Sequence, residues 1–232
     1  MPDELETFVS RHWEDFASGV ASGLKDAADH RLESLLHVTT SSSTTPYRVS
    51  AAWPPEPDGR TTFRQVTAHV TQWAYRFRAT WTIGVEAQRP GNPAEARQAA
   101  QKFAAEAALA ETQSVLDLLV PASAGPLDSS AVKRAATRFD GRCRLLVRRA
   151  AKGATSDPVT FEQVVVPDEA MPSRIDALLV ATRDGPAVER LGDDLALTWA
   201  RTGKRTAELA LTSDVLLRHG RRASSFRLPS TP

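Results

Sequence analysis

Hydrophobic and polar residues alternate almost without interruption from Trp73 to Val85. Alternation with a period of two residues predicts a strand that has one face on a core and the other in water. At about 3.3 Å per residue such a strand would reach about 45 Å, so we expect it to twist, bend or carry a bulge. Its apolar face carries four large aromatic residues, Trp73, Tyr75, Phe77 and Trp81.

Two further strands are predicted before this one, over residues 47–53 and 61–70, with the turn sequence PPEPDG between them. The apolar positions change from even to odd numbers at Thr71–Gln72, which indicates a bulge or a bend. The pattern is therefore compatible with one continuous bent strand over residues 62–86.

Two long helices are predicted from spacings of three and four residues. The first covers residues 3–38, with a break near Gly19–Gly23. The second begins with Asn92 as N-cap and Pro93 at the first helical position, and it ends at about Leu119. This second helix is rich in alanine, so it can approach another helix or a sheet closely.

The second half of the chain reads mainly as antiparallel strands after a short helix at 130–138. Residues 142–149 and 159–166 are predicted strands, and 175–182 fits a strand or a helix equally well. A hairpin is predicted around Thr202-Gly203-Lys204, because apolar residues alternate on both sides of it.

These elements predict an α+β fold, in which two long helices cover a twisted antiparallel sheet containing the long aromatic strand. We expect a lobe over residues 1–122 and a β-rich basic lobe over 123–220, which can also form one domain. The polar, basic residues 221–232 are expected to form a flexible tail.

Composition narrows the class of protein. No apolar run approaches the ~20 residues of a membrane span, and the acidic N-terminal residues do not resemble a secretory signal. A single cysteine, Cys143, excludes an internal disulfide and a cysteine-built zinc site. Arginine outnumbers lysine 24 to 5, which is typical of a GC-rich genome. We therefore expect a soluble, cytoplasmic, bacterial protein.

Charge is distributed unevenly along the chain. Residues 1–60 contain 10 acidic and 5 basic residues, whereas residues 131–232 contain 12 acidic and 18 basic residues. The two regions therefore carry net charges of −5 and +6, although the whole chain carries only +1. Such segregation favours self-association or a protein partner, and it also admits an anionic partner for the basic region.

Nucleic-acid binding is an alternative function. It would depend on arginines whose side chains lie on the same face of a predicted strand. Alternate residues of a strand lie about 6.6–7 Å apart, which suits successive phosphates. The candidates for this basic patch are Arg76, Arg78, Arg142, Arg144 and Arg148.

A metal site is suggested by imidazole and carboxylate groups at spacings of four, three and four residues. On a helix, however, this stripe lies opposite the apolar face, so we expect a solvated surface without a bound metal. The residues concerned are Asp26, His30, Glu33 and His37.

The aromatic face has two interpretations. Its rings fill a core under the two helices, or they line a ligand cavity, since a curved sheet wrapped around a helix encloses a cone. In outline, a long N-terminal helix followed by long curved strands is similar to the NTF2-like α+β cone, which implies a small-molecule binder or a cofactor-free enzyme. The cavity candidates are Trp73, Tyr75, Phe77 and Trp81.

No motif for a nucleophile elbow, a phosphate-binding loop, a dinucleotide site or a zinc protease occurs. Cys143 alternates with Leu145 and Val147, which predicts a buried structural thiol. The hypothesis favoured by the sequence is a non-enzymatic protein-interaction or assembly component without a cofactor. The aromatic-cavity binder and the nucleic-acid binder remain as alternatives.

Overall fold

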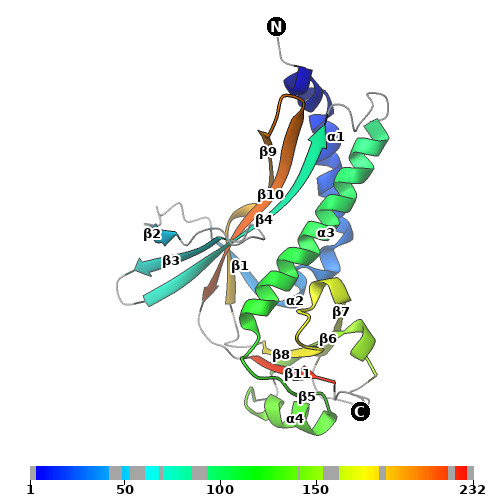
Figure 1. The fold of residues 1–232 in the computed structure, drawn as a ribbon. Coiled ribbons are helices and arrows are strands. Elements are labelled where there is room, and N and C mark those ends of the chain that lie inside the picture. Colours follow the sequence, from blue (N-terminus) through cyan, green and yellow to red (C-terminus); the bar gives the residue numbers. More distant parts are fainter. Residues whose placement is uncertain are drawn as a thin grey trace. The chain divides into compact units, whose positions relative to one another are not determined.

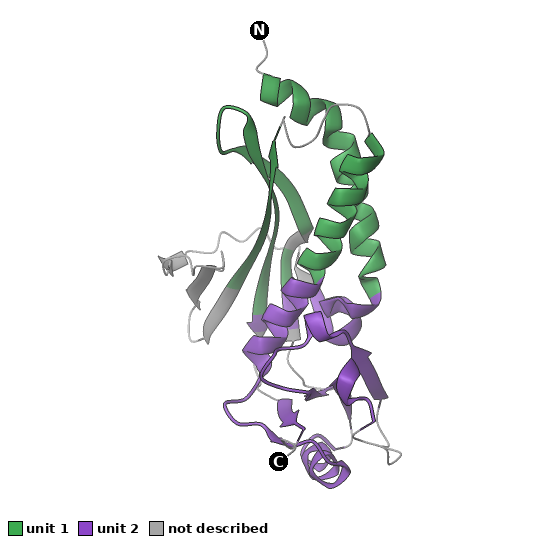
Figure 2. Cartoon of the chain, turned by 45° about the vertical axis from the view of Figure 1, so that its right-hand side comes forward, with its two compact units in different colours: residues 1–28, 40–108, 190–216 green, residues 29–39, 109–189, 217–232 purple. Residues whose placement is uncertain are grey.

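The computed structural model describes residues 4–41, 49–52, 61–67, 70–84, 93–140, 142–153, 162–182, 187–218 and 223–228. They form an α+β fold, as predicted, with the elements labelled in Figure 1. The chain divides into two compact units, coloured in Figure 2. Unit 1 comprises residues 1–28, 40–108 and 190–216; unit 2 comprises residues 29–39, 109–189 and 217–232. Each unit thus combines three segments, whereas the expected lobes are continuous stretches.

Helix α1 (Glu4–Asp26) is shorter than predicted. The chain continues as a 3₁₀ turn (Ala28–His30), the short helix α2 (Leu32–Leu35) and strand β1 (His37–Ser41). The prediction of helix up to residue 38 is therefore wrong. Its last residues belong to β1, in which β-branched Val38 and the following Thr39 favour a strand. Gly19 and Gly23 lie inside α1 and do not break it.

Helix α3 (Pro93–Leu119) matches the predicted second helix at both ends, although the predicted N-cap, Asn92, lies outside the described residues. In unit 1, α1 and α3 run side by side at close range (Figure 1). The contact consists of small residues: Gly19 of α1 lies against Ala100 of α3, and Gly23 lies against Ala104. The alanine-rich sequence of α3 thus serves close helix packing.

The larger sheet has the strand order β1-β9-β10-β4-β3-β2. Its strands besides β1 are β2 (Val49–Ala52), β3 (Thr61–Thr67), β4 (Val70–Gly84), β9 (Ala187–Arg201) and β10 (Thr206–Arg218).

Strands β3 and β4 pair antiparallel, with Thr67 opposite Val70. A continuous bent strand over residues 62–86 is therefore the wrong interpretation of the parity change, because the chain reverses between two strands. The predicted hairpin around Gly203 is confirmed. The backbone N–H groups of Thr202 and Gly203 both donate to the carbonyl oxygen of Thr206, at 3.1 Å.

Within β4, burial alternates along the part whose side chains are described. Tyr75, Phe77 and Ile83 are buried, whereas Arg76 and Arg78 are exposed. The side chain of Trp73 lies outside the described part.

Unit 2 contains the smaller sheet, in the order β5-β11-β8-β6-β7. Its strands are β5 (Gly125–Pro126), β6 (Cys143–Arg148), β7 (Glu162–Val166), β8 (Ala177–Ala181) and β11 (Ala223–Arg227). Helix α4 (Ser129–Thr137) is also in this unit. Two short 3₁₀ helices also lie in this unit, Arg149–Ala151 and Asp168–Ala170.

Pairing in this sheet is mixed, which corrects the antiparallel prediction. Strands β6 and β7 are parallel, as are β11 and β5, whereas β8 is antiparallel to both β6 and β11. The ambiguous segment 175–182 contains strand β8, all of whose residues are buried. Part of the expected flexible tail is strand β11.

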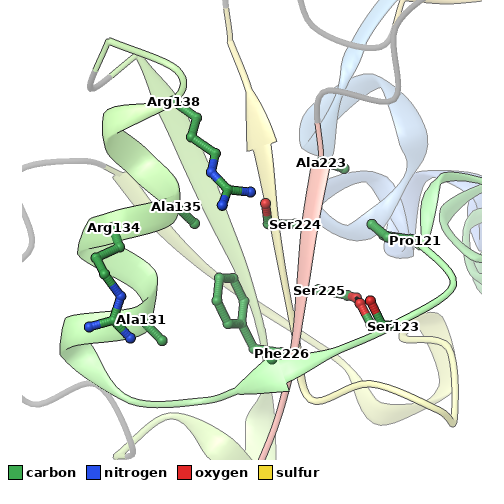
Figure 3. Close-up of a pocket in the computed structure, with 11 residues that line it drawn as sticks. Pro121, Ser123, Ala131, Arg134, Ala135, Arg138, Ala223, Ser224, Ser225 and Phe226 are labelled. Carbon is green, nitrogen blue, oxygen red and sulfur yellow. The ribbon is translucent and has the colours of Figure 1, made fainter.

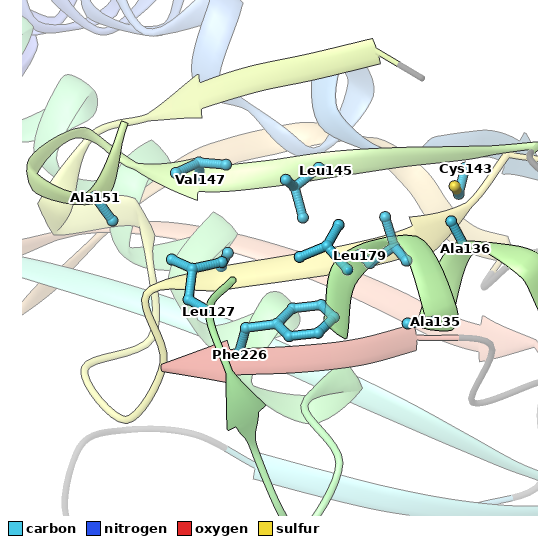
Figure 4. Packing of buried hydrophobic residues seen from close by; sticks show 11 residues of the cluster. Leu127, Ala135, Ala136, Cys143, Leu145, Val147, Ala151, Leu179 and Phe226 are labelled. Carbon is cyan, nitrogen blue, oxygen red and sulfur yellow. The ribbon is translucent and has the colours of Figure 1, made fainter. Parts of the chain in front are cut away.

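One hydrophobic cluster joins the sheet of unit 2 to α4 (Figure 4). Leu145, Val147 and Leu179 project from β6 and β8, and the ring of Phe226 from β11 packs against the same cluster. Phe226 is only 3% exposed. This burial explains why the last strand joins the sheet, since removing a phenyl ring from water contributes about 1.5–3 kcal/mol.

Candidate functional site

The aromatic face of β4 packs against helix side chains in unit 1. The half-buried indole of Trp81 meets Phe16 of α1 edge-on, with ring centroids 5.9 Å apart, and Phe103 of α3 at 5.8 Å. Tyr75 and Phe77 are each 5% exposed. These contacts favour the core interpretation of the aromatic face over a ligand cavity.

The outer face of β4 carries two of the predicted basic-patch residues, and both pair with acids on the neighbouring strand β10. Arg76 donates two hydrogen bonds to Asp214, at 2.7 and 2.8 Å. The hydrogen bond to Asp214 also raises the pKa of Arg76 above its ordinary value. Arg78 forms an ion pair with Glu208. Both guanidinium groups are thus largely neutralised within the sheet.

In unit 2, Arg148 holds together the loop before β8. Its Nη2 atom donates to the carbonyl oxygens of Pro172 and Ile175, at 2.9 and 3.1 Å. Its Nε atom lies 3.5 Å from a carboxylate oxygen of Asp176, and its side chain is only 17% exposed. Arg148 is therefore a structural residue.

Arg144 has a similar role on the same strand. It donates to the carbonyl oxygens of Ser34 and Leu35, at 2.7 and 3.1 Å, and to the Glu162 carboxylate, at 2.9 Å. By contrast, Arg142 is exposed. Four of the five predicted arginines therefore bind carboxylate or carbonyl groups of their own unit.

The expected helical stripe of Asp26, His30, Glu33 and His37 does not exist as one stripe, because the four residues lie in α1, a 3₁₀ turn, α2 and β1. Asp26 accepts a hydrogen bond from Gln101 at 2.6 Å. Among the residues that the structure describes, no group of three or more metal-ligating side chains could hold an ion.

Cys143 is a buried free thiol, in agreement with its predicted place on the apolar face of β6. Burial raises the pKa of its thiol, because the thiolate would lose its hydration. The neutral thiol is a poor nucleophile, so the structure favours a packing role for this residue.

A pocket that the sequence did not indicate lies between α4 and β11 in unit 2 (Figure 3). Its volume is about 320 Å³. Arg134 lines it from α4 and Arg138 from the C-cap position directly after α4, while Ser224 and Phe226 line it from β11. Sequence reasoning missed it because one wall belongs to the expected tail; the four-residue spacing of the two arginines was the available signal.

The chain was compared with known proteins by sequence and by structure. Neither a protein-family model nor a curated protein matches the chain. Solved structures do match: a virus-like particle from Pyrococcus furiosus has a TM-score of 0.58 and 12% identity, covering 92% of this chain and 98% of that chain. The chain has an HK97-like fold.

A second solved structure shares the HK97-like fold. The encapsulin of the holo-SrpI complex from Synechococcus elongatus PCC 7942 has a TM-score of 0.52 and 11% identity, covering 87% of this chain and 88% of that chain. The similarity to the NTF2-like cone, which was expected from the order of helix and strands in the sequence, is therefore wrong, because the fold is HK97-like. No described helix is long and apolar enough to cross a membrane.

Proposed function

We propose that this chain is a self-assembling subunit of a closed protein shell. The observation that carries the proposal is the near-complete match, in both directions, to a virus-like particle protein. Because 92% of this chain aligns with 98% of that protein, the likeness involves the whole subunit architecture and not an inserted module. The encapsulin match supports the same proposal over 87% of the chain.

The charge distribution provides a physical basis for association. The N-terminal 60 residues carry a net charge of −5, and residues 131–232 carry +6. In a shell of identical subunits, acidic surface of one copy can meet basic surface of the next, which guides docking and sets its orientation. Such contacts weaken as salt increases, because counter-ions screen exposed charges.

An exposed aromatic side chain gives a candidate contact. Trp199 of β9 is 37% exposed, and on the same strand face Leu195 is buried and Leu197 is half-buried. The apolar face of β9 therefore continues from the core to the surface. Tryptophan is enriched at the centres of protein interfaces, where its large ring loses water on binding.

We further propose that the shell acts in the bacterial cytoplasm and has no catalytic role of its own. The excess of arginine over lysine, 24 to 5, supports the bacterial origin. The pairing of Arg76, Arg78, Arg144 and Arg148 within the protein does not favour nucleic acid as the partner of the predicted basic patch.

Light scattering coupled to size-exclusion chromatography, followed by negative-stain electron microscopy, tests the proposal. The full chain is expected to form hollow particles of uniform diameter, with a mass many times the 25.2 kDa of one chain. Measurements at low and high salt would show the electrostatic part of the association. A monodisperse monomer or dimer at every salt concentration would contradict the proposal, as would amorphous aggregates alone.

A further inference from the structure

The pocket between α4 and β11 has a cationic wall. Arg134 lies in α4 and Arg138 is the C-cap directly after it, with helical backbone angles, so two side chains four residues apart leave the same face. Like charges at this spacing repel each other and weaken a helix. None of the eleven lining residues is acidic, so an anion placed between the two guanidinium groups would relieve this repulsion.

The two arginines differ in how far they are already neutralised. Arg134 donates to Ser130 Oγ at 3.2 Å, and the Ser130 hydroxyl donates in turn to the Asp128 carboxylate at 2.7 Å. Among the described residues, the Arg138 guanidinium has no hydrogen-bond or ion-pair partner, and it points across the pocket toward Ser224 (Figure 3). Arg138 is therefore the cation most available to a ligand.

The opposite wall supplies hydroxyl and apolar groups. Ser224 is half-buried on β11, while Ser225 donates its hydroxyl to the carbonyl oxygen of Ser123, at 3.3 Å. Ala131, Ala135 and the ring of Phe226 form the apolar part of the lining. A hydroxyl facing a guanidinium across a pocket of about 320 Å³ can hold a single anionic group.

We propose that this pocket binds a small organic anion. Its carboxylate or phosphate group lies between Arg138 and Ser224, with Arg134 contributing further positive charge. Its compact apolar body lies on Ala131, Ala135 and Phe226. The volume is at the lower end of the roughly 300–1,000 Å³ of small-molecule sites, so a single ring fits and a dinucleotide does not.

The site is complete within unit 2 of a single chain, so its occupancy does not depend on shell assembly. A bound anion would join α4 to β11, and binding to the folded state alone raises its stability. Failure to bind would leave the proposed shell function intact, and a monomeric protein could still bind.

Isothermal titration calorimetry on the full chain tests the proposal with four probes at constant ionic strength: phenyl phosphate, benzoate, inorganic phosphate and benzyl alcohol. We expect saturable binding, one ligand per chain, of phenyl phosphate or benzoate, and comparison of the two identifies the preferred anionic group. Inorganic phosphate is expected to bind more weakly because it lacks the apolar body, and neutral benzyl alcohol is expected not to bind.

Substitutions locate the binding site. Arg138→Gln is expected to lower the affinity about tenfold or more, because a charge-assisted hydrogen bond is lost. Ser224→Ala is expected to lower it by a smaller factor. Arg149→Gln is the matched control, since Arg149 is an exposed arginine of the same unit that does not line the pocket. Undetectable binding of both aromatic anions, or equal affinity of the Arg138→Gln and Arg149→Gln variants, would overturn the proposal.

Discussion

Gly19 of α1 and Ala100 of α3 are in direct contact: a Cβ atom added to Gly19 would lie only 2.8 Å from the Cβ atom of Ala100. It would also lie too close to the backbone carbonyl of Arg97, which cannot rotate away as a flexible side chain could. Gly23 repeats the relationship one turn later against Ala104, at 2.9 Å. The two helices therefore pack at a distance that only glycine at these positions permits.

We predict that Gly19→Ala destabilises the protein by about 1–3 kcal/mol, because the added methyl group forces the helices of unit 1 apart. An isolated helix would respond in the opposite direction, since alanine is the better helix former by about 1 kcal/mol. Chemical denaturation measures the difference. The control is the reverse substitution at exposed Ala21 of the same helix, where Ala21→Gly should cost about 0.5–1 kcal/mol. A more stable Gly19→Ala variant would show that the helices are not in close contact.

A second prediction concerns the aromatic contacts of β4. Phe16 is fully buried, with its ring edge-on to Trp81, so Phe16→Ala is expected to cost about 3–5 kcal/mol. Arg78→Ala on the exposed face should cost less than about 1 kcal/mol, although it breaks the ion pair with Glu208. Urea denaturation compares the two variants. Equal transition midpoints would mean that the face carrying Trp81 is not part of a packed core.

The third prediction separates a structural arginine from a surface arginine. Arg148→Ala removes hydrogen bonds to the carbonyl oxygens of Pro172 and Ile175, and is expected to cost about 2–3 kcal/mol. Arg142→Ala should cost less than about 0.5 kcal/mol, because that side chain is exposed. Thermal unfolding of both variants measures this. If Arg148→Ala instead left stability unchanged and abolished binding to a DNA or RNA oligonucleotide, the structural role of Arg148 would be refuted.

The fourth prediction is a pH dependence at the start of α4. The carboxylate of Asp128, the N-cap, accepts a hydrogen bond from the backbone N–H of Ala131 and a second from the Ser130 hydroxyl. These bonds favour the charged form and lower the pKa of Asp128 below its ordinary value of 3.8. A carboxyl whose pKa is lower in the folded state stabilises the protein above the unfolded pKa and loses that contribution as pH falls through the folded pKa.

The expected result is that Asp128→Ala lowers the melting temperature at neutral pH, and that this difference shrinks as pH falls from about 4 through the lower pKa of Asp128 in the folded state. Asp128→Asn is the matched control, because asparagine caps a helix nearly as well and does not titrate. Its melting temperature should remain close to that of the wild-type protein at neutral pH. A difference between Asp128→Ala and the wild type that persists undiminished at pH 2 would contradict the assignment.

The fifth prediction tests a contact for shell assembly. Trp199→Ser is expected to reduce the fraction of particles and to increase the fraction of small species, because a neighbouring subunit would lose an apolar anchor. Thr198→Ala is the control: it changes the preceding exposed residue of β9, on the opposite face of the strand. Light scattering and circular dichroism measure mass and folding in parallel. Normal particle yield from Trp199→Ser would exclude Trp199 as an essential contact.

Much of the secondary structure followed from local pattern. Pro93 and the residues around it predicted the start of α3, because proline restricts the backbone in the same way in any environment. Alternation around Gly203 predicted the hairpin of β9 and β10 for a similar reason. The α+β class could also be inferred from the sequence, although nothing in it pointed to the HK97-like fold.

Tertiary structure decided which elements meet, because the partner of a strand is chosen by non-local hydrogen bonds and shared burial. The residues of β6 and β7 carry no local mark of parallel pairing. Phe226 lies in a polar, basic segment whose sequence has no alternation of hydrophobic and polar residues. Its burial nevertheless brings β11 into the sheet, and its ring forms part of the wall of the proposed anion pocket. Likewise, the sequence predicted Arg148 to be part of a basic surface patch. In the folded protein it donates to the carbonyl oxygens of Pro172 and Ile175. The sequence by itself determined the elements and their apolar faces, and long-range packing determined their partners and the pocket between them.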